Sequence, residues 1–128
     1  MSQTVWRIAT DTPAYEADDL SGAGAKTTGG RWNAAGIPLV YVSQTRALAC
    51  LETVVHLNAG GLPPNRCLVE TTIPGDFWDN AQTASPTSVP VGWDAEPAWR
   101  ANIGFGANWI RSEATALLIV VCQAARRR

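Results

Sequence analysis

Apolar runs between turn-forming residues predict four strands along this chain. Each run is rich in Val, Ile, Leu or aromatic residues, a composition that suits the pleated surface of a sheet. The runs cover residues 5–9, 39–42, 67–73 and 116–122. The last run has no polar alternation, which is typical of a central strand covered on both faces. We therefore expect the C-terminal run to lie inside a sheet.

A helical spacing of apolar residues follows the second run. Apolar positions, Leu51 among them, repeat at three- and four-residue intervals from a capping Ser or Thr within residues 43–45 to a glycine stop at residues 58–61. Glu52 and His56 are one helical turn apart and fall together on the edge of this apolar stripe. The pattern therefore places a carboxylate where it can reach a cleft.

The second half of the chain predicts loops and short helices. Residues 79–97 are rich in Pro, Ser, Thr and Asp, and they predict a long loop or a movable flap. Residues 97–100 and 106–110 predict two short helical pieces, separated by a kink at Gly104 and Gly106.

Composition indicates one folded domain without a general affinity for polyanions. The 128 residues are 46 % hydrophobic and include 6 Trp, and strands and helices alternate without an internal repeat. Residues 1–128 therefore predict a single α+β domain. The formal net charge is −1, from 10 basic and 11 acidic residues, so we expect no direct contact with nucleic acid or membrane. The basic run at residues 126–128 is expected to be a solvated tail.

The cysteines predict an intracellular protein. Cys50, Cys67 and Cys122 are odd in number and lie in apolar surroundings, which favours buried free thiols over a disulfide framework. The N-terminus lacks the charged and apolar regions of a signal peptide, and the apolar run at residues 116–122 is too short to cross a bilayer. We therefore expect a cytoplasmic protein.

The first candidate site residue is Arg31, which follows two glycines directly. Glycines let a backbone approach a ligand closely, and a guanidinium can donate two parallel hydrogen bonds to a phosphate. Arg31 at this turn therefore suits a pyrophosphate. A tight turn with a surface arginine is the simpler alternative for this motif alone.

The second candidate is Tyr41, on the predicted strand at residues 39–42. A functional tyrosine there could stack on a flat heteroaromatic ring such as nicotinamide and direct its hydroxyl at a polar atom. The alternative is an aromatic side chain of the core.

The third candidate is Glu52, because a carboxylate at the margin of an apolar helix face costs desolvation free energy unless it has a use. Departure of nicotinamide from a dinucleotide leaves positive charge on the ribose, which a nearby anion can stabilise. His56, the only histidine, could assist one turn later. A solvated edge glutamate and a rim histidine bound to backbone are the alternatives.

Motifs of several other enzyme classes are missing from the sequence. One His and three scattered Cys match no zinc pattern, so we expect no metal. The sequence has no Gly-x-Ser-x-Gly, no phosphate loop ending in Gly-Lys-Ser, and no Gly-x-Gly-x-x-Gly between a strand and a helix. The sequence therefore disfavours a reversible dehydrogenase.

An ordered set of motifs resembles the RES-domain family, which is named for an Arg, a Glu and a Ser. The resemblance runs from Trp6 to Val121 and is carried by residues 5–8, 29–33, 36–43 and 47–52. Known members are toxins of bacterial toxin–antitoxin pairs that act on NAD. The resemblance implies an ADP-ribosyltransferase-like α+β fold here, with twisted mixed sheets and short helices, and NAD as the substrate.

The resemblance also assigns the three catalytic residues. Arg31 matches the family Arg, Glu52 matches the family Glu, and Tyr41 matches the aromatic residue after the turn. All three are therefore expected to act on NAD, with Arg31 and Tyr41 also binding it.

Three further residues are expected to contact NAD. Arg46 and His56 flank the same predicted helix as Glu52. The family Ser usually ends a Val-Pro-Ser segment, where this chain has Val121-Cys122-Gln123. Gln123 could offer a hydrogen bond in place of the serine hydroxyl.

The resemblance implies partners as well as chemistry. Family members pass ADP-ribose to water or phosphate, or they transfer it to a protein, and the shared motifs do not distinguish these acceptors. Their antitoxins carry a helix-turn-helix DNA-binding domain and block the toxin's cleft, so a heteromeric complex is expected. The alternative function is that of a catalytically weak remnant, which keeps the fold and the antitoxin-binding surface.

Overall fold

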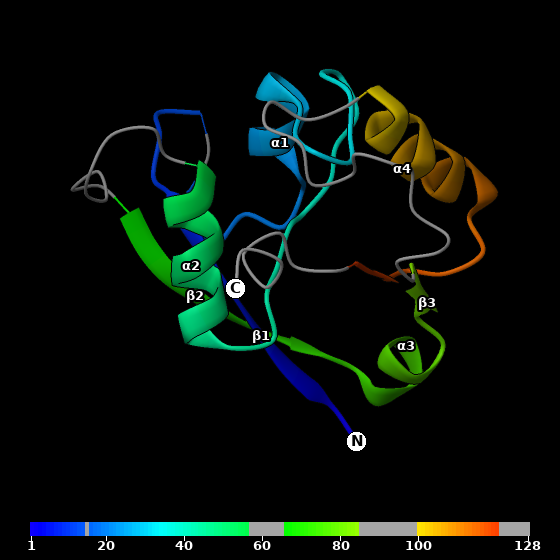
Figure 1. The fold of residues 1–128 in the computed structure, drawn as a ribbon. Coiled ribbons are helices and arrows are strands. Elements are labelled where there is room, and N and C mark those ends of the chain that lie inside the picture. Colours follow the sequence, from blue (N-terminus) through cyan, green and yellow to red (C-terminus); the bar gives the residue numbers. More distant parts are fainter. Residues whose placement is uncertain (15, 57–65, 85–99, 121–128) are drawn as a thin grey trace.

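A computed structural model of the chain describes residues 1–14, 16–56, 66–84 and 100–120, without the side chains of residues 54–56. Strands and helices are mixed along the described chain, as the sequence predicts (Figure 1). In chain order the elements are β1 (Gln3–Thr10), α1 (Ala23–Thr28), α2 (Arg46–His56), β2 (Arg66–Ile73), α3 (Gly75–Asp79), β3 (Gln82–Thr83), α4 (Arg100–Ser112) and β4 (Leu118–Ile119). The expected α+β class is therefore confirmed.

Strands β1 and β2 form a long antiparallel ribbon. The register runs from Gln3 opposite Ile73 to Thr10 opposite Arg66. Both strands contain runs that the sequence predicts as strands, at residues 5–9 and 67–73, and both predictions are confirmed. Helix α2 packs against β1. The ribbon and α2 together form one side of the molecule (Figure 1).

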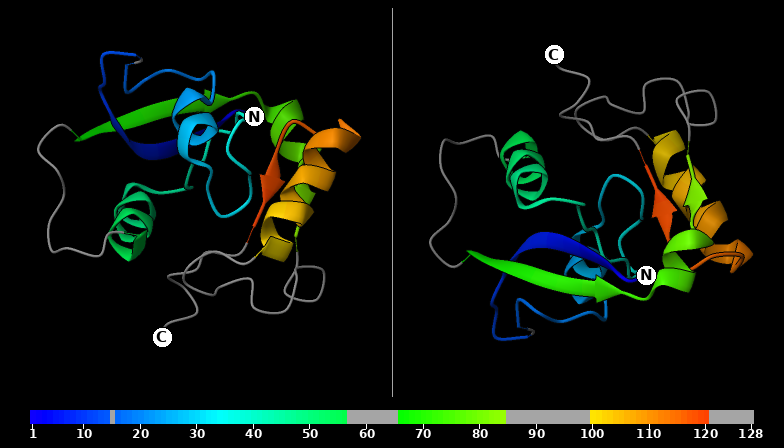
Figure 2. Two further views of the ribbon diagram at one scale, coloured as in Figure 1. Left: turned by 90° about the horizontal axis from the view of Figure 1, so that it is seen from above. Right: turned by 90° about the horizontal axis from the view of Figure 1, so that it is seen from below.

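Strands β3 and β4 pair in parallel and form a second, short β unit beside α3 and α4 (Figure 2). The predicted strand at residues 116–122 is too long at its start, because β4 begins at Leu118 and holds Leu118 and Ile119 of the described residues, while residues 121–122 lie outside them. Within the described chain β4 has a single hydrogen-bonded neighbour, β3, so a central position is not observed either. An apolar run indicates that its residues are buried, and burial does not require a long strand. Leu118 packs on the core although β4 is short.

The segment between α1 and α2 crosses from one β unit to the other (Figures 1 and 2). It pairs with β1 at one point, where Trp6 and Ser43 exchange hydrogen bonds of 2.7 and 2.8 Å between their backbone groups. The predicted strand at residues 39–42 is therefore wrong. The apolar residues of this run are typical of a strand, but the chain forms only one bridge with β1, at Ser43, before α2 begins.

Helix α2 confirms the predicted helix, and Thr45 caps it by accepting a 3.0 Å hydrogen bond from the Leu48 N–H. The predicted stripe is only partly correct. Of the predicted apolar positions, Leu48 is half-buried and Leu51 is 53 % exposed, whereas Ala49, which lies outside the predicted stripe, is buried. Leu51 is two positions from Ala49 and so points about 200° away around the helix. The predicted stop at residues 58–61 lies outside the described residues.

Helix α4 is continuous from Arg100 to Ser112, so the predicted kink at Gly104 and Gly106 is wrong. Two glycines weaken an isolated helix by about 1 kcal/mol each. Tertiary packing overrides that preference, because the α4 backbone at Gly106 lies directly against the carbonyl of Trp32. Residues 97–99 of the first predicted piece lie outside the described chain.

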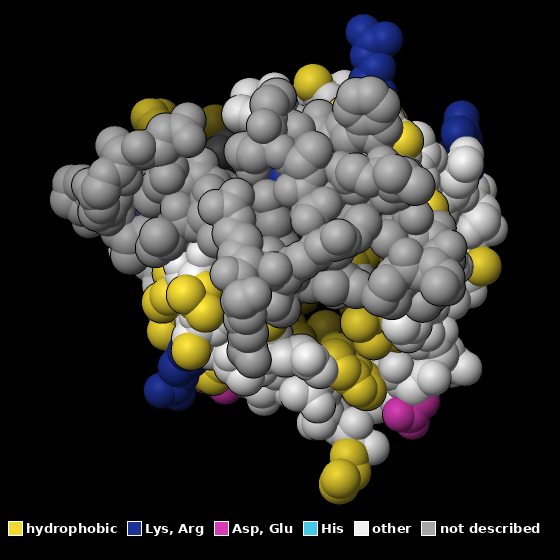
Figure 3. Space-filling model, viewed as in Figure 1, with side chains coloured by type: hydrophobic (Ala, Val, Ile, Leu, Met, Phe, Trp, Pro, Cys, Tyr) yellow, Lys and Arg dark blue, Asp and Glu magenta, His cyan; other side chains and the backbone are white. Residues whose placement is uncertain are grey.

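The core joins the crossing segment to the second β unit. Trp32 and Ala84 are buried together, and Leu39, Phe105, Leu118 and Val120 pack against them. The rings of Trp32 and Phe105 meet edge to face, with centroids 5.9 Å apart. Hydrophobic side chains also gather around a recess on one face of the molecule (Figure 3). The core therefore holds in place the residue that follows Arg31.

Three other predictions meet the structure in part. The predicted loop at residues 79–97 begins inside α3 and contains β3, and its residues from 85 onward lie outside the described chain. Cys50 and Cys67 are free thiols as expected, but both are exposed, so their predicted burial is wrong. Cys50 lies on the outer side of α2, next to buried Ala49, and Cys122 is not described. None of the helices among the described residues has the length and apolar character to cross a membrane.

Candidate active site

A cavity of about 670 Å³ lies between the ribbon, α2 and the second β unit. Arg31, Tyr41 and Glu52 all line it, although they come from a turn, an extended segment and a helix. The lining also includes apolar side chains from β1, α2 and β4. The structure therefore brings the three residues that the sequence singles out to the lining of one cavity.

Arg31 is held in a turn that begins where α1 ends. Gly29 ends the helix with a φ of 73°, a conformation that favours glycine, and its N–H donates a 2.7 Å bond to Ala25. Arg31 itself is only 9 % exposed, although it is charged. The alternative of a surface arginine is therefore wrong, since a solvated side chain would not be buried in this way.

Asn33 organises this turn. Its side chain is 1 % exposed, and its Nδ2 donates to the carbonyl oxygens of Ala25 at 3.0 Å and Ile37 at 2.8 Å. Its backbone oxygen accepts a 3.0 Å bond from the Gly30 N–H. Through its side-chain amide and its backbone oxygen, Asn33 thus ties the end of α1 to both sides of Arg31. The sequence analysis missed this role because a lone Asn in a turn carries no distinctive signal.

The hydroxyl of Tyr41 completes the same network. It donates a 2.6 Å bond to Asn33 Oδ1 and accepts a 3.0 Å bond from the Trp32 N–H. Gly30 makes room for it, since a Cβ on Gly30 would lie 2.8 Å from the hydroxyl oxygen. The paired glycines therefore serve this close internal approach, and the hydroxyl is already engaged within the protein.

The ring of Tyr41 remains partly accessible. The side chain as a whole is 38 % exposed, so the alternative of a core aromatic is wrong. Its hydroxyl end is enclosed, and burial raises the pKa of Tyr41 to about 12 against the lowering effects of the Trp32 N–H and the Arg31 charge. The face of the ring can contact a ligand while its hydroxyl holds the turn.

This environment predicts an unusual titration. We expect one of the 2 tyrosines to ionise only near pH 12 in an ultraviolet titration of the folded protein, and Tyr41→Phe to remove that step. An unfolded tyrosine ionises near pH 10.0, whereas folding keeps Tyr41 protonated up to about pH 12. The contribution of the protonated Tyr41 to the free energy of unfolding is therefore complete below pH 10 and is lost as pH rises to about 12. Ionisation of both tyrosines near pH 10 in the folded protein would contradict the enclosed hydroxyl.

The remaining predicted residues lie apart from the cavity lining or outside the described atoms. The Arg46 guanidinium carbon is 4.3 Å from the centre of the Trp6 ring, and Trp6 lines the cavity while Arg46 does not. His56 is the last residue of α2, but its side chain is not described. Gln123 lies outside the described residues.

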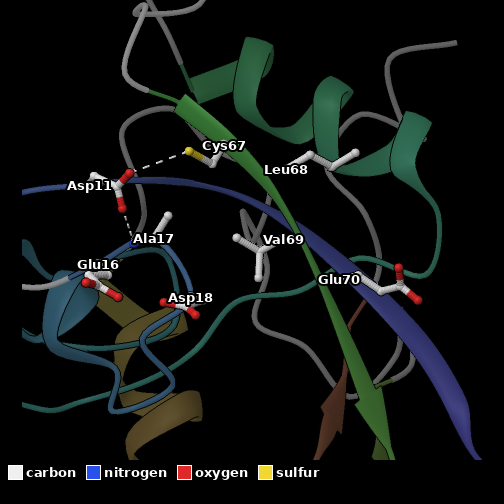
Figure 4. A pocket seen from close by; sticks show the side chains of 8 residues that line it. All are labelled: Asp11, Glu16, Ala17, Asp18, Cys67, Leu68, Val69 and Glu70. Atoms are coloured by element: carbon white, nitrogen blue, oxygen red, sulfur yellow. Dashed lines mark hydrogen bonds between the residues drawn. The ribbon is translucent and has the colours of Figure 1, made fainter.

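A second cavity of about 620 Å³ has the opposite chemical character (Figure 4). Its lining includes the carboxylates of Asp11, Glu16, Asp18 and Glu70, and the Cys67 thiol lies 3.7 Å from Asp11 Oδ2. Such a lining repels the phosphates of a dinucleotide. Among the described residues, no group of three or more His, Cys, Asp or Glu side chains is placed to hold a metal ion.

Comparisons with known proteins point to one family. The RES domain family matches residues 4–127 of this chain. A Sphingobium sp. (strain YBL2) protein named Prs ADP-ribosylating toxin is 62 % identical over 120 residues, which are 94 % of this chain and 74 % of that protein.

More distant relatives carry the name Toxin Res. The protein of Yersinia enterocolitica is 32 % identical over 106 residues, covering 83 % of this chain and 68 % of its own length. The protein of Pseudomonas putida is 33 % identical over 119 residues, covering 91 % and 73 %. This chain therefore belongs to the RES-domain family, as its motifs predict, and has the family's ADP-ribosyltransferase-like α+β fold.

Proposed function

We propose that this protein is a toxin that cleaves the bond between nicotinamide and ribose in NAD. The observation that carries the proposal is the shared cavity, because it collects a cation, an aromatic ring and a carboxylate from three separate elements. The name of the Sphingobium relative, an ADP-ribosylating toxin at 62 % identity, supports the same chemistry.

Each side chain has a distinct role in this reaction. Arg31 binds the pyrophosphate through its guanidinium, and the ring of Tyr41 lies along the nicotinamide end. Glu52 stabilises the positive charge that develops on the ribose as the carbon–nitrogen bond breaks and nicotinamide leaves with the electron pair. The acceptor then forms a new bond to the ribose carbon and releases a proton.

The partial burial of Glu52 suits this role. Glu52 lies on α2 beside Ala49, which is 4 % exposed, and shares the cavity with apolar side chains. Apolar surroundings lower the effective dielectric constant, so a carboxylate there acts more strongly on a developing cation. A site open to solvent would screen the same pair of charges.

We propose a protein as the acceptor of ADP-ribose. The name of the Sphingobium relative supports transfer and makes the Prs protein the first acceptor to test. The Toxin Res names of three relatives support a toxin–antitoxin pair. In that setting the toxin acts in the cytoplasm, and an antitoxin with a helix-turn-helix domain covers the cavity.

The proposal is tested by incubating the purified protein with NAD labelled in its adenylate part. We expect free nicotinamide together with a labelled protein band when purified Prs or cell extract is added, and neither product in the reaction without an acceptor protein. Soluble ADP-ribose, or its phosphate in phosphate buffer, would identify water or phosphate as the acceptor and would contradict protein transfer. No nicotinamide release by a protein with folded-state circular dichroism would overturn NAD cleavage and favour the catalytically weak remnant.

A further inference from the structure

Arg66 lines the same cavity as Arg31 and Glu52, although no motif in the sequence marks it. It is the first residue of β2 and is partly buried. Its Nε is buried and has no hydrogen-bond partner among the described residues. Buried donors in folded proteins nearly always have acceptors, so an acceptor supplied by a ligand would explain this one.

The strand register determines the side of the ribbon on which Arg66 lies. Arg66 is opposite Thr10, and side chains alternate between the two faces of a strand, so Arg66 shares a face with Trp6. The guanidinium of Arg46, from α2, lies over the Trp6 ring. Arg66 is therefore on the face that α2 covers, and α2 carries Glu52.

Arg7, a second arginine of the ribbon, has a different role. It also lines the cavity, but its Nη2 donates to the carbonyl oxygens of Ala17 at 2.6 Å and Asp19 at 2.5 Å. Those bonds tie its guanidinium to the segment after β1. The Nε atoms of Arg7 and Arg66 are both buried without a hydrogen-bond partner, but among the described residues no bond like those of the Arg7 Nη2 holds the Arg66 guanidinium. Arg66 is thus the ribbon arginine that can turn its donors toward a ligand.

The charges of the cavity favour an anion at this position. Among the described residues of the lining, Arg7, Arg31 and Arg66 are basic and Glu52 is the one carboxylate. A guanidinium matches phosphate with parallel, charge-assisted hydrogen bonds, which are stronger than its bonds to a neutral acceptor. We propose that Arg66 is a second oxyanion-binding residue of the cavity, which takes a phosphate group in addition to the one at Arg31.

The ligand class rests on the proposed NAD cleavage, since NAD contains a pyrophosphate. Phosphate as the acceptor is the outcome that would replace protein transfer. The oxyanion can thus come from the dinucleotide or from a separate phosphate. Equilibrium binding distinguishes these sources, with ADP-ribose and inorganic phosphate titrated separately and followed by calorimetry. Wild type is compared with Arg66→Gln, which removes the charge, and Arg66→Lys, which keeps it.

We expect Arg66→Gln to weaken binding of one probe by about 10- to 100-fold, the range for loss of a charged hydrogen bond. Weaker binding of ADP-ribose assigns the phosphate to the dinucleotide, and weaker binding of inorganic phosphate alone assigns it to the acceptor. Arg66→Lys should recover part of the loss. Arg111→Gln is the matched control, because Arg111 is exposed on α4 and bonds only to Asn108 Oδ1 among the described residues.

Unchanged binding of both probes to Arg66→Gln would overturn the inference. That result would leave NAD cleavage intact wherever the wild type still releases nicotinamide. Conversely, weakened binding in Arg66→Gln beside a wild type that releases no nicotinamide would support the oxyanion site and overturn the proposed function. Urea unfolding of each variant shows whether the loss comes from the site or from the fold.

Discussion

Replacement of Glu52 by Gln is expected to reduce nicotinamide release on the order of 10²-fold. The substitution keeps the size of the side chain and its capacity to hydrogen-bond, and it removes only the negative charge. That charge acts on the ribosyl cation, which exists near the transition state and not in bound NAD. The rate should therefore fall through kcat, with the KM for NAD little changed.

A matched carboxylate outside the cavity provides the control. Glu16 is exposed and lines the second cavity, whose lining contains four carboxylates. Glu16→Gln therefore removes the same charge without changing the candidate active site. Its nicotinamide release should equal that of the wild type. If Glu52→Gln kept more than half of the wild-type rate of nicotinamide release, Glu52 would not be a catalytic residue.

Replacement of Gly106 by Ala is expected to destabilise the fold by about 2 kcal/mol or more, net of the roughly 1 kcal/mol that alanine gains in a helix. A Cβ on Gly106 would lie 1.8 Å from the carbonyl oxygen of Trp32, and it would also crowd the Trp32 carbonyl carbon at 2.8 Å. Both contacts are backbone atoms, which cannot rotate away. Either α4 or the turn that carries Arg31 must therefore move.

The same substitution two residues earlier should have the opposite sign. Gly104 lies in the same helix and is exposed, and apart from the adjoining turns of α4 no atom lies within 4 Å of an added Cβ. Gly104→Ala should therefore stabilise the protein by about 0.5–1 kcal/mol. Urea unfolding of the two variants measures this difference. Equal shifts in the same direction would show that α4 does not press on the Trp32 carbonyl.

Movement of the turn that carries Arg31 should also reduce NAD cleavage. Trp32 follows Arg31 directly, and its N–H holds the Tyr41 hydroxyl at 3.0 Å. A displaced Trp32 backbone would therefore shift Arg31 and Tyr41, the two residues proposed to bind NAD. Gly106→Ala should consequently lose NAD cleavage even under conditions where most molecules remain folded.

Several features of the protein follow from its sequence alone. Apolar runs between turn formers locate β1 and β2, and a helical spacing of apolar residues locates α2. The ordered motifs identify the family, and with it the expectation that Arg31, Tyr41 and Glu52 act together. Each of those residues has an ordinary alternative role when it is considered singly.

Other features depend on contacts between distant parts of the chain, which local patterns do not record. The Tyr41 hydroxyl is bound within the turn because Asn33 Oδ1 lies 2.6 Å from it. Helix α4 can pass the Trp32 carbonyl because the residue at the contact is Gly106. The place of Arg66 requires the ribbon register, in which β1 pairs with a strand more than fifty residues later. Sequence spacing therefore determined which residues to consider for NAD. Only tertiary packing decided that the Tyr41 hydroxyl supports the turn and that Arg66 joins the cavity, because pairing and close approach bring together groups whose separation along the chain carries no signal.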